Sequence, residues 1–107
     1  MSKTIYLSGP MTGLPELNYP RFREVADTLR KLGHVVYNPA DFPHIGPFPI
    51  RQAFAEYTAF ICNRADTIVM LEGWERSKGA LAEKALAENC GLKVIFYSDE
   101  GIRVTDG

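Results

Sequence analysis

Four short runs of apolar residues divide the chain and predict the strands of a sheet. The runs are continuous rather than alternating, which is typical of strands covered on both faces of a parallel sheet. A weaker fifth run at 102–104 fits an edge strand. The four strong runs are Ile5–Leu7, Val35–Tyr37, Thr67–Leu71 and Lys93–Tyr97.

Helical patterns fill the three intervals between these runs, with apolar residues recurring at a spacing of three and four. Pro20 suits the first turn of the first helix and Gly33 its end, and Ser77 is a natural N-cap for the third. We expect the helices at about 20–32, 50–61 and 78–90.

This alternation of strands and helices predicts a three-layer α/β/α sandwich of the Rossmann or flavodoxin type. The chain has 107 residues, enough for one hydrophobic core, so we expect a single domain over residues 1–107. Its parallel sheet would have four or five strands in the order 2-1-3-4-5.

The loops that follow strands are longer than those that follow helices, and in a parallel sheet the former all lie at one edge. Ligands bind at that edge, where the strand order reverses. In the expected order the reversal falls between strands 1 and 3. The turn Ser8-Gly9-Pro10 should therefore lie beside Glu72-Gly73-Trp74.

Composition and charge exclude several classes of protein. Hydrophobic residues make up 46% and charged residues 23%, the balance of a globular domain, and the net charge is −1. A near-neutral chain lacks a broad electrostatic attraction to a nucleic-acid backbone. No apolar run reaches the length of a membrane span, and no secretory leader is recognisable, so we expect a cytoplasmic protein without membrane or nucleic-acid partners.

Metal and nucleotide-cofactor motifs are missing from the sequence. Cys62, Cys90, His34 and His44 have no plausible co-ligands nearby in sequence, and we expect both cysteines to be small buried residues. Neither a Gly-rich dinucleotide motif nor a P-loop occurs. The sequence therefore predicts no metal and no cofactor.

Glu83 is the most informative polar residue. It falls on the side of the third helix away from the exposed pair Lys84 and Glu88, and no cation lies one turn from it. One interpretation is an acid at the margin of the wet face. The functional interpretation is a carboxylate that points into a cleft, where Gly79 leaves room beside it.

Other candidates surround the same sheet edge. Tyr6, at the end of the first strand, is placed to donate a hydrogen bond to Glu83, or is a core tyrosine. Ser77 and Gly79 open the third helix, where backbone N–H groups favour an anion, although a plain N-cap explains Ser77 equally well. Trp74 either stacks on a nucleobase or closes its loop. Arg21, Arg23 and Arg51 begin helices near this edge, where most arginines are solvated.

Three segments together resemble the nucleoside 2-deoxyribosyltransferase superfamily. Residues 5–10 resemble its first strand and turn, 65–71 its third strand, and Ser77-Lys78-Gly79-Ala80-Leu81-Ala82-Glu83 its active-site helix, which carries Gly-x-x-x-Glu. The longer string from Gly73 to Glu83 is similar to a small, largely phage-borne branch of unassigned function. The resemblance covers the chain from Lys3 to Tyr97.

The resemblance implies that Glu83 is a nucleophile that attacks C1′ of a deoxyribosyl group and expels the base. Tyr6 would orient Glu83, and Ser8, Gly9 and Pro10 would line the substrate pocket together with Trp74, Ser77 and Gly79. Ser77, where transferases of free nucleosides often have Asp, favours a 5′-monophosphate, because a hydroxyl can donate to a phosphate. The resemblance also implies a homo-oligomer.

One departure from the family pattern concerns the general acid. The superfamily usually has an Asp on the preceding helix, and here that place is near Thr58, which cannot protonate a leaving base. Glu56, Asp41 or Glu75 would have to substitute.

Three hypotheses remain open on the sequence. The first is an N-glycosidase or deoxyribosyltransferase that acts on a deoxynucleoside or its 5′-monophosphate. The second is a phage protein that binds or sequesters a nucleotide without turnover. The third is an interaction module that uses the same fold without a ligand.

Overall fold

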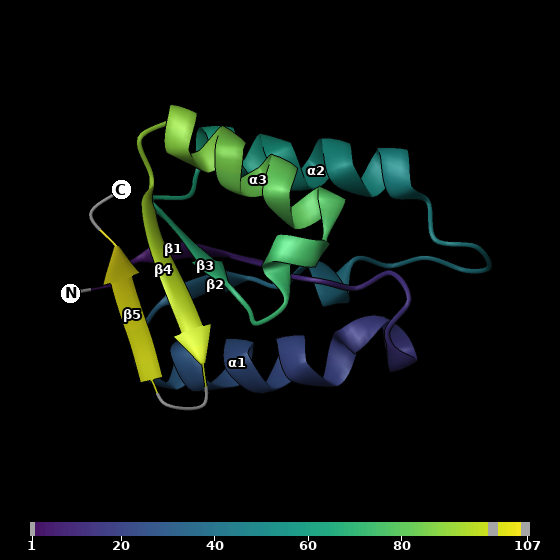
Figure 1. Ribbon diagram of the computed structural model, residues 1–107, viewed down its shortest axis with the longest axis horizontal. Helices are drawn as coiled ribbons and strands as arrows, with labels where there is room; N and C mark the ends of the chain where they lie inside the picture. Colours follow the sequence, from purple (N-terminus) through teal and green to yellow (C-terminus); the bar gives the residue numbers. More distant parts are fainter. Residues whose placement is uncertain (1, 99–100, 106–107) are drawn as a thin grey trace.

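A five-stranded sheet forms the middle layer of the fold (Figure 1). The computed structural model describes residues 2–98 and, for residues 101–105, the backbone alone. The strands follow the order β2 (Val35–Tyr37), β1 (Thr4–Ser8), β3 (Thr67–Met70), β4 (Lys93–Ser98) and β5 (Gly101–Thr105). The predicted strand order is confirmed.

Three helices cover the two faces of the sheet. Helix α1 (Tyr19–Lys31) lies on one face, and α2 (Ile50–Asn63) and α3 (Lys78–Asn89) lie side by side on the other (Figure 1). Short helical turns at Pro15–Asn18, Pro39–Asp41 and Trp74–Arg76 occupy the loops that follow β1, β2 and β3. The predicted three-layer α/β/α sandwich is therefore confirmed.

The fifth strand departs from the all-parallel expectation. Strands β1 to β4 are parallel, but β5 pairs antiparallel with β4, with Ser98 opposite Gly101. Only two residues separate β4 from β5 in the sequence. A parallel return needs a crossover of a dozen residues or more, whereas two suffice for an antiparallel hairpin. The parallel sheet therefore has four strands, and the fifth run forms an edge strand, as expected, in the antiparallel direction.

Strand β1 divides the hydrophobic core into two halves. Ile5 and Leu7 pack with buried residues of α1, while Tyr6 packs with residues of α2 and α3. Successive side chains of a strand point to opposite faces. Ser8, two residues after Tyr6, therefore faces α2 and α3 as well, which brings two hydroxyl groups to one face of the sheet.

Both cysteines are exposed, contrary to the expectation that they are buried. The buried stripe of α2 consists of Ala53, Tyr57 and Ile61, and Cys62 lies one residue, about 100°, away from it. Cys90 follows the last residue of α3 as its C-cap. Cysteine is usually buried, but the places of these two residues on their helices leave both exposed.

The chain segments just beyond the carboxyl ends of β1 and β3 leave no room for a side chain at Gly9. The backbone N–H of Leu71 donates to the carbonyl of Ser8 at 2.8 Å, just beyond the end of β3. A Cβ placed on Gly9 would lie 2.8 Å from the Cβ of Leu71. The turn after β1 also contacts the loop after β3, where Pro10 lies against Gly73, as the loop pattern predicted.

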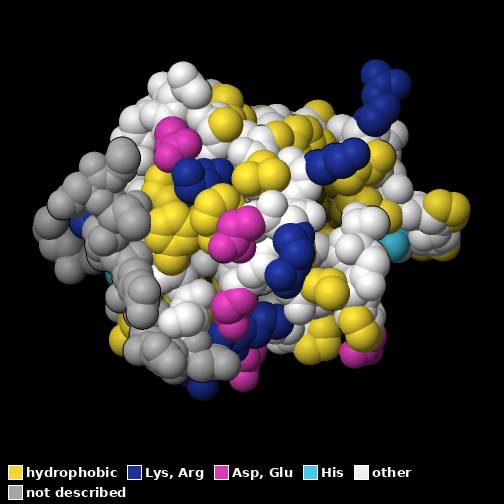
Figure 2. All heavy atoms as spheres, in the orientation of Figure 1, with side chains coloured by type: hydrophobic (Ala, Val, Ile, Leu, Met, Phe, Trp, Pro, Cys, Tyr) yellow, Lys and Arg dark blue, Asp and Glu magenta, His cyan; other side chains and the backbone are white. Residues whose placement is uncertain are grey.

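None of the helices that the structure describes combines the length and the apolar character needed to cross a membrane. On the face shown in Figure 2, acidic and basic side chains are interspersed rather than separated by sign. That face therefore has no broad region of a single charge.

The close approach at Gly9 generates a stability prediction with an internal control. Gly9→Ala forces a Cβ into the buried Leu71 and should lower the free energy of unfolding by about 1–3 kcal/mol. Gly79→Ala, in the first turn of α3, meets only the Ser77 hydroxyl at 4.0 Å and should be neutral or slightly stabilising. Urea unfolding of both variants measures the difference. Equal stabilities would contradict the described contact of β1 with β3.

Candidate active site

A pocket of about 150 Å³ opens at the carboxyl edge of the sheet, above the end of β1 and beside the first turns of α2 and α3. An engineered cavity of this volume holds benzene, so this pocket accommodates one ring of a ligand. Residues from the loops after β1 and β2 complete its wall. The lining residues are Tyr6, Ser8, Gly9, Met11, Thr12, Leu17, Phe22, Pro39, Phe48, Ile50, Phe54, Tyr57, Ser77, Gly79, Ala80 and Glu83.

Glu83 lines this pocket and is held by two hydroxyl groups from β1. The hydroxyl of Ser8 donates to Oε1 at 2.6 Å, and the hydroxyl of Tyr6 donates to Oε2 at 2.8 Å. Glu83 is only 6% exposed, which is unusual for a side chain that carries a charge in its ionised form. The predicted hydrogen bond from Tyr6 and the predicted inward direction of Glu83 are both present. The bond from Ser8 was not predicted.

Burial and hydrogen bonding act in opposite directions on Glu83. Desolvation raises its pKa, whereas the hydrogen bonds from Ser8 and Tyr6 lower it, and the balance raises the pKa from 4.5 to about 7. Burial also raises the pKa of Tyr6 well above that of an ordinary phenol. Tyr6 therefore keeps its proton at neutral pH and can donate to an ionised Glu83.

The first turn of α3 and its N-cap contribute part of the pocket wall. The hydroxyl oxygen of Ser77 accepts from the backbone N–H of Ala80 at 3.1 Å, so the predicted N-cap is confirmed. Ser77, Gly79 and Ala80 all line the pocket. Only the Ser77 hydroxyl would lie within 4 Å of a Cβ on Gly79. The positive end of the helix dipole is thus directed toward this space.

Two residues predicted to bind substrate lie outside the pocket lining. Pro10 packs against Gly73, and Trp74 packs against Phe96 with ring centroids 5.4 Å apart. The ammonium group of Lys84 lies 5.3 Å from the Trp74 ring. Gly73 has a left-handed backbone (φ +87°), after which the chain continues into the turn at Trp74–Arg76. Trp74 closes its loop in this structure, which is the second of the two interpretations given above.

The general-acid position is not filled by a carboxylate within the described pocket wall. Thr58 donates to the carbonyl of Phe54, in its own helix, at 2.9 Å. Glu56 accepts from the Tyr37 hydroxyl and, like Asp41 and Glu75, does not line the pocket. Glu83 is therefore the one carboxylate among the lining residues that the structure describes.

The aromatic wall was missed by sequence reasoning. Ile50, Phe54 and Tyr57 of α2 line the pocket, together with Phe48 from the preceding loop. The hydroxyl of Tyr57 donates to the carbonyl of Pro39 at 3.0 Å, which joins α2 to the loop after β2. The helical spacing of these residues was visible, but it predicts a core face. Only the tertiary structure shows that part of this face also lines the pocket.

The loop after β1 also contributes pocket residues through an uncommon backbone conformation. Glu16, Leu17 and Asn18 all have positive φ angles of 52–62°, and Leu17 lines the pocket. Such angles cost non-glycine residues about 1–2 kcal/mol each. The Asn18 side chain donates to the carbonyl of Pro10 at 3.0 Å and so helps to hold the loop.

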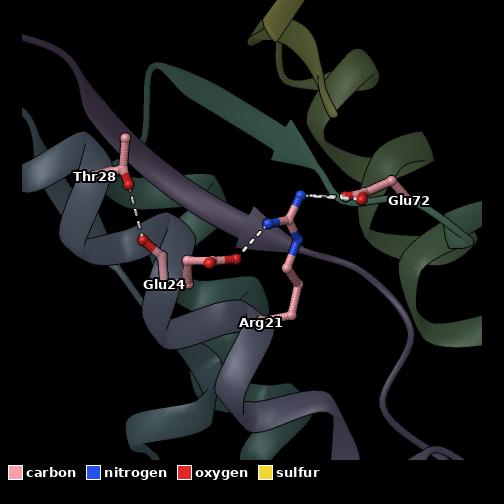
Figure 3. Close-up of polar contacts among 4 residues, drawn as sticks. All are labelled: Arg21, Glu24, Thr28 and Glu72. Atoms are coloured by element: carbon pink, nitrogen blue, oxygen red, sulfur yellow. Dashed lines mark hydrogen bonds and ion pairs between the residues drawn. The ribbon is translucent and has the colours of Figure 1, made fainter. Parts of the chain in front are cut away.

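Arg21 holds the loop that leads from β3 to α3 (Figure 3). Its guanidinium donates to both carboxylate oxygens of Glu72, at 3.0 and 3.2 Å, and also pairs with Glu24. Arg21, Arg23 and Arg51 are not among the lining residues of the pocket.

Within the described part of the chain, no three His, Cys, Asp or Glu side chains are grouped as a metal site would require.

The raised pKa of Glu83 predicts a specific pH dependence of stability. Below about pH 4.5 Glu83 is protonated in both states, and between 4.5 and about 7 only the unfolded state ionises. Stability is therefore lost as pH rises through this window, by about 3 kcal/mol. The difference in unfolding free energy between wild type and Glu83→Gln should change by this amount between about pH 4 and pH 8. The exposed Glu88→Gln is the control, and parallel curves for wild type and Glu83→Gln would contradict the assignment.

Comparisons with known proteins identify the family of this chain. No curated protein shows a significant match to this sequence. A family model does match, and it covers residues 3–96, which include every strand from β1 to β3, all three helices and most of β4. Every residue that lines the pocket falls within this range. The chain therefore belongs to the family described as "Domain of unknown function (DUF4406)".

Proposed function

We propose that this protein breaks or transfers the N-glycosidic bond of a deoxynucleoside or deoxynucleoside 5′-monophosphate, with Glu83 as the nucleophile at C1′. The observation that carries the proposal is a buried carboxylate, in a pocket at the sheet edge, with one hydroxyl donor on each oxygen. The resemblance of residues 73–83 to the active-site helix of the nucleoside 2-deoxyribosyltransferase superfamily supports it.

The chemistry that this arrangement suits proceeds in two displacements. In the first, an oxygen of ionised Glu83 bonds to C1′ while the C1′–N bond breaks and its electron pair leaves with the base. In the second, water or another base attacks C1′ and releases Glu83. A proton from the attacking group balances the one taken up by the expelled base. Two of the roughly four lone-pair directions of the carboxylate hold Ser8 and Tyr6, and the others remain for the sugar.

The size and polarity of the pocket favour a small substrate. A volume of about 150 Å³ fits one ring, so the remainder of a nucleotide extends out of the pocket. Ser77 and Gly79 line the pocket at the N-terminus of α3, which favours a phosphate group. The aromatic side chains Phe48, Phe54 and Tyr57 provide the apolar surface that a planar base or the carbon face of a sugar needs.

A non-catalytic nucleotide binder is the second candidate. The observation that favours it is the lack of a second carboxylate in the described pocket wall, because a leaving base needs a proton. A protein that sequesters a nucleotide needs the same pocket and no general acid. The expectations of a homo-oligomer, a cytoplasmic location, a phage origin and no nucleic-acid partner accompany both candidates as predictions.

Base release tests the proposal directly. Incubation with each of the four deoxynucleosides and their 5′-monophosphates, followed by chromatography, should show free base from at least one of them. Glu83→Gln should lower the rate by at least about 10³-fold, because it removes the nucleophile. Glu88→Gln changes an exposed glutamate of the same helix, paired with Lys84, and should leave the rate unchanged.

The alternative outcomes of this experiment separate the candidates. Tight binding of a nucleotide by calorimetry, without base release, would reject the enzymatic proposal and support the binder. Base release that survives in Glu83→Gln would reject Glu83 as the nucleophile.

The pH dependence of base release should report the ionisation of Glu83. Because a nucleophile must be ionised, kcat should rise about tenfold per pH unit below about 7 and level off above it. The hydrogen bonds from Ser8 and Tyr6 lower this pKa, so Ser8→Ala and Tyr6→Phe should both move the midpoint to higher pH. A rate that falls as pH rises through 7 would instead make Glu83 a proton donor.

A further inference from the structure

Cys62 and Cys90 form a pair of thiols on the surface, away from the pocket. Their sulfur atoms lie 4.0 Å apart, close to contact, although the residues are 28 positions apart in sequence. Both side chains are exposed. Neither residue lines the pocket, and nothing in the proposed function uses them.

The placement of the pair follows from the packing of two helices. Cys62 lies in the last turn of α2, and Cys90 caps the C-terminus of α3. The two helices lie side by side and run in the same direction, so their C-terminal ends meet at the end remote from the pocket (Figure 1). Glu83 is seven residues before Cys90, about 10 Å along the helix axis. A disulfide or an adduct at these thiols would therefore not contact Glu83 directly.

We propose that Cys62 and Cys90 form a reversible dithiol–disulfide site that exchanges with low-molecular-weight disulfides such as oxidised glutathione. A disulfide has an S–S distance of about 2.05 Å. The sulfurs are 4.0 Å apart on exposed side chains, so they must approach by about 2 Å to form the bond. Because the side chains are exposed, the small disulfide can reach one of the protein sulfurs. Because the two sulfurs are close, the second cysteine can then attack the mixed disulfide that forms.

The exchange proceeds in two balanced steps. One cysteine thiolate attacks a sulfur of oxidised glutathione, which gives a mixed disulfide and releases one glutathione thiolate. The second cysteine, after losing its proton, attacks the protein sulfur of the mixed disulfide and releases the other glutathione. Overall, two protein thiols are oxidised to one disulfide, and one small disulfide is reduced to two thiols.

The oxidised form links the ends of two helices that also form the pocket wall. Tyr57 of α2 and Glu83 of α3 lie on the linked elements. Closing a loop between residues 28 apart restricts the unfolded chain, which should raise Tm by roughly 10 °C. Reduction should reverse the shift.

The test uses the 107-residue chain in glutathione redox buffers at about pH 9. Desolvation and the neighbouring Cys90 raise the pKa of the Cys62 thiol, so an alkaline buffer is needed to supply its thiolate. Mass spectrometry should show a monomer that has lost two hydrogens, and peptide mapping without reductant should join the peptides that contain Cys62 and Cys90. Dithiothreitol should restore both free thiols and the lower Tm.

The two single variants are matched controls. Cys62→Ser and Cys90→Ser each keep one thiol, so each should stop at a stable glutathione adduct and show no rise in Tm. Wild-type protein that accumulates the same adducts on either cysteine would overturn the proposal. Disulfide-linked dimers in place of the internal link would overturn it as well. Base release plays no part in these readouts, so this proposal and the proposed function fail independently.

Discussion

The candidate site depends on the interaction of one buried carboxylate with two hydroxyl groups from another element. Glu83 is removed from water by α3 and the sheet, which disfavours its ionised form. Ser8 and Tyr6 partly offset this cost, because hydrogen bonds to a charged acceptor are stronger than those between neutral groups. The outcome is a carboxyl group that changes charge near neutral pH.

That interaction requires β1 and α3 to be placed accurately against each other. Tyr6 and Ser8 present their hydroxyls together because they are two residues apart on a strand. Glu83 meets them because α3 begins at a fixed point, with Ser77 as its N-cap. A small displacement of α3 along its axis would separate the carboxylate from both donors, which lie 75 and 77 residues earlier in the sequence.

Residues 72–76 of the loop before α3 support this placement and do not line the pocket, whereas Ser77 at the end of the loop does. Trp74 packs against Phe96 of β4, and Glu72 accepts two hydrogen bonds from Arg21 of α1. The loop is thereby attached to elements on both faces of the sheet. Trp74 and Arg21, which the sequence suggested as contacts for a base and a phosphate, instead hold the loop that precedes α3.

The sequence by itself determined the elements and singled out the key acid. Continuous apolar runs, helical spacing and the Ser77 cap are local signals, so they predict the strands and helices and place Glu83 on the side of its helix away from Lys84 and Glu88. Its direction into the pocket was one of two interpretations, and the tertiary contacts with Ser8 and Tyr6 decided it. The long loops after strands likewise indicated the ligand edge, since parallel topology places them there.

Tertiary structure alone decided which of the available residues form the pocket. The aromatic residues of α2 follow a pattern typical of a core face, and only the tertiary structure shows that Phe54 and Tyr57 also line the pocket. The exposure of Cys62 and Cys90 and their contact depend on how two helix ends meet. Trp74 lies outside the pocket lining because it packs against Phe96, which is distant from it in the sequence. These contacts join residues far apart in the chain, and local patterns carry no information about distances of that kind.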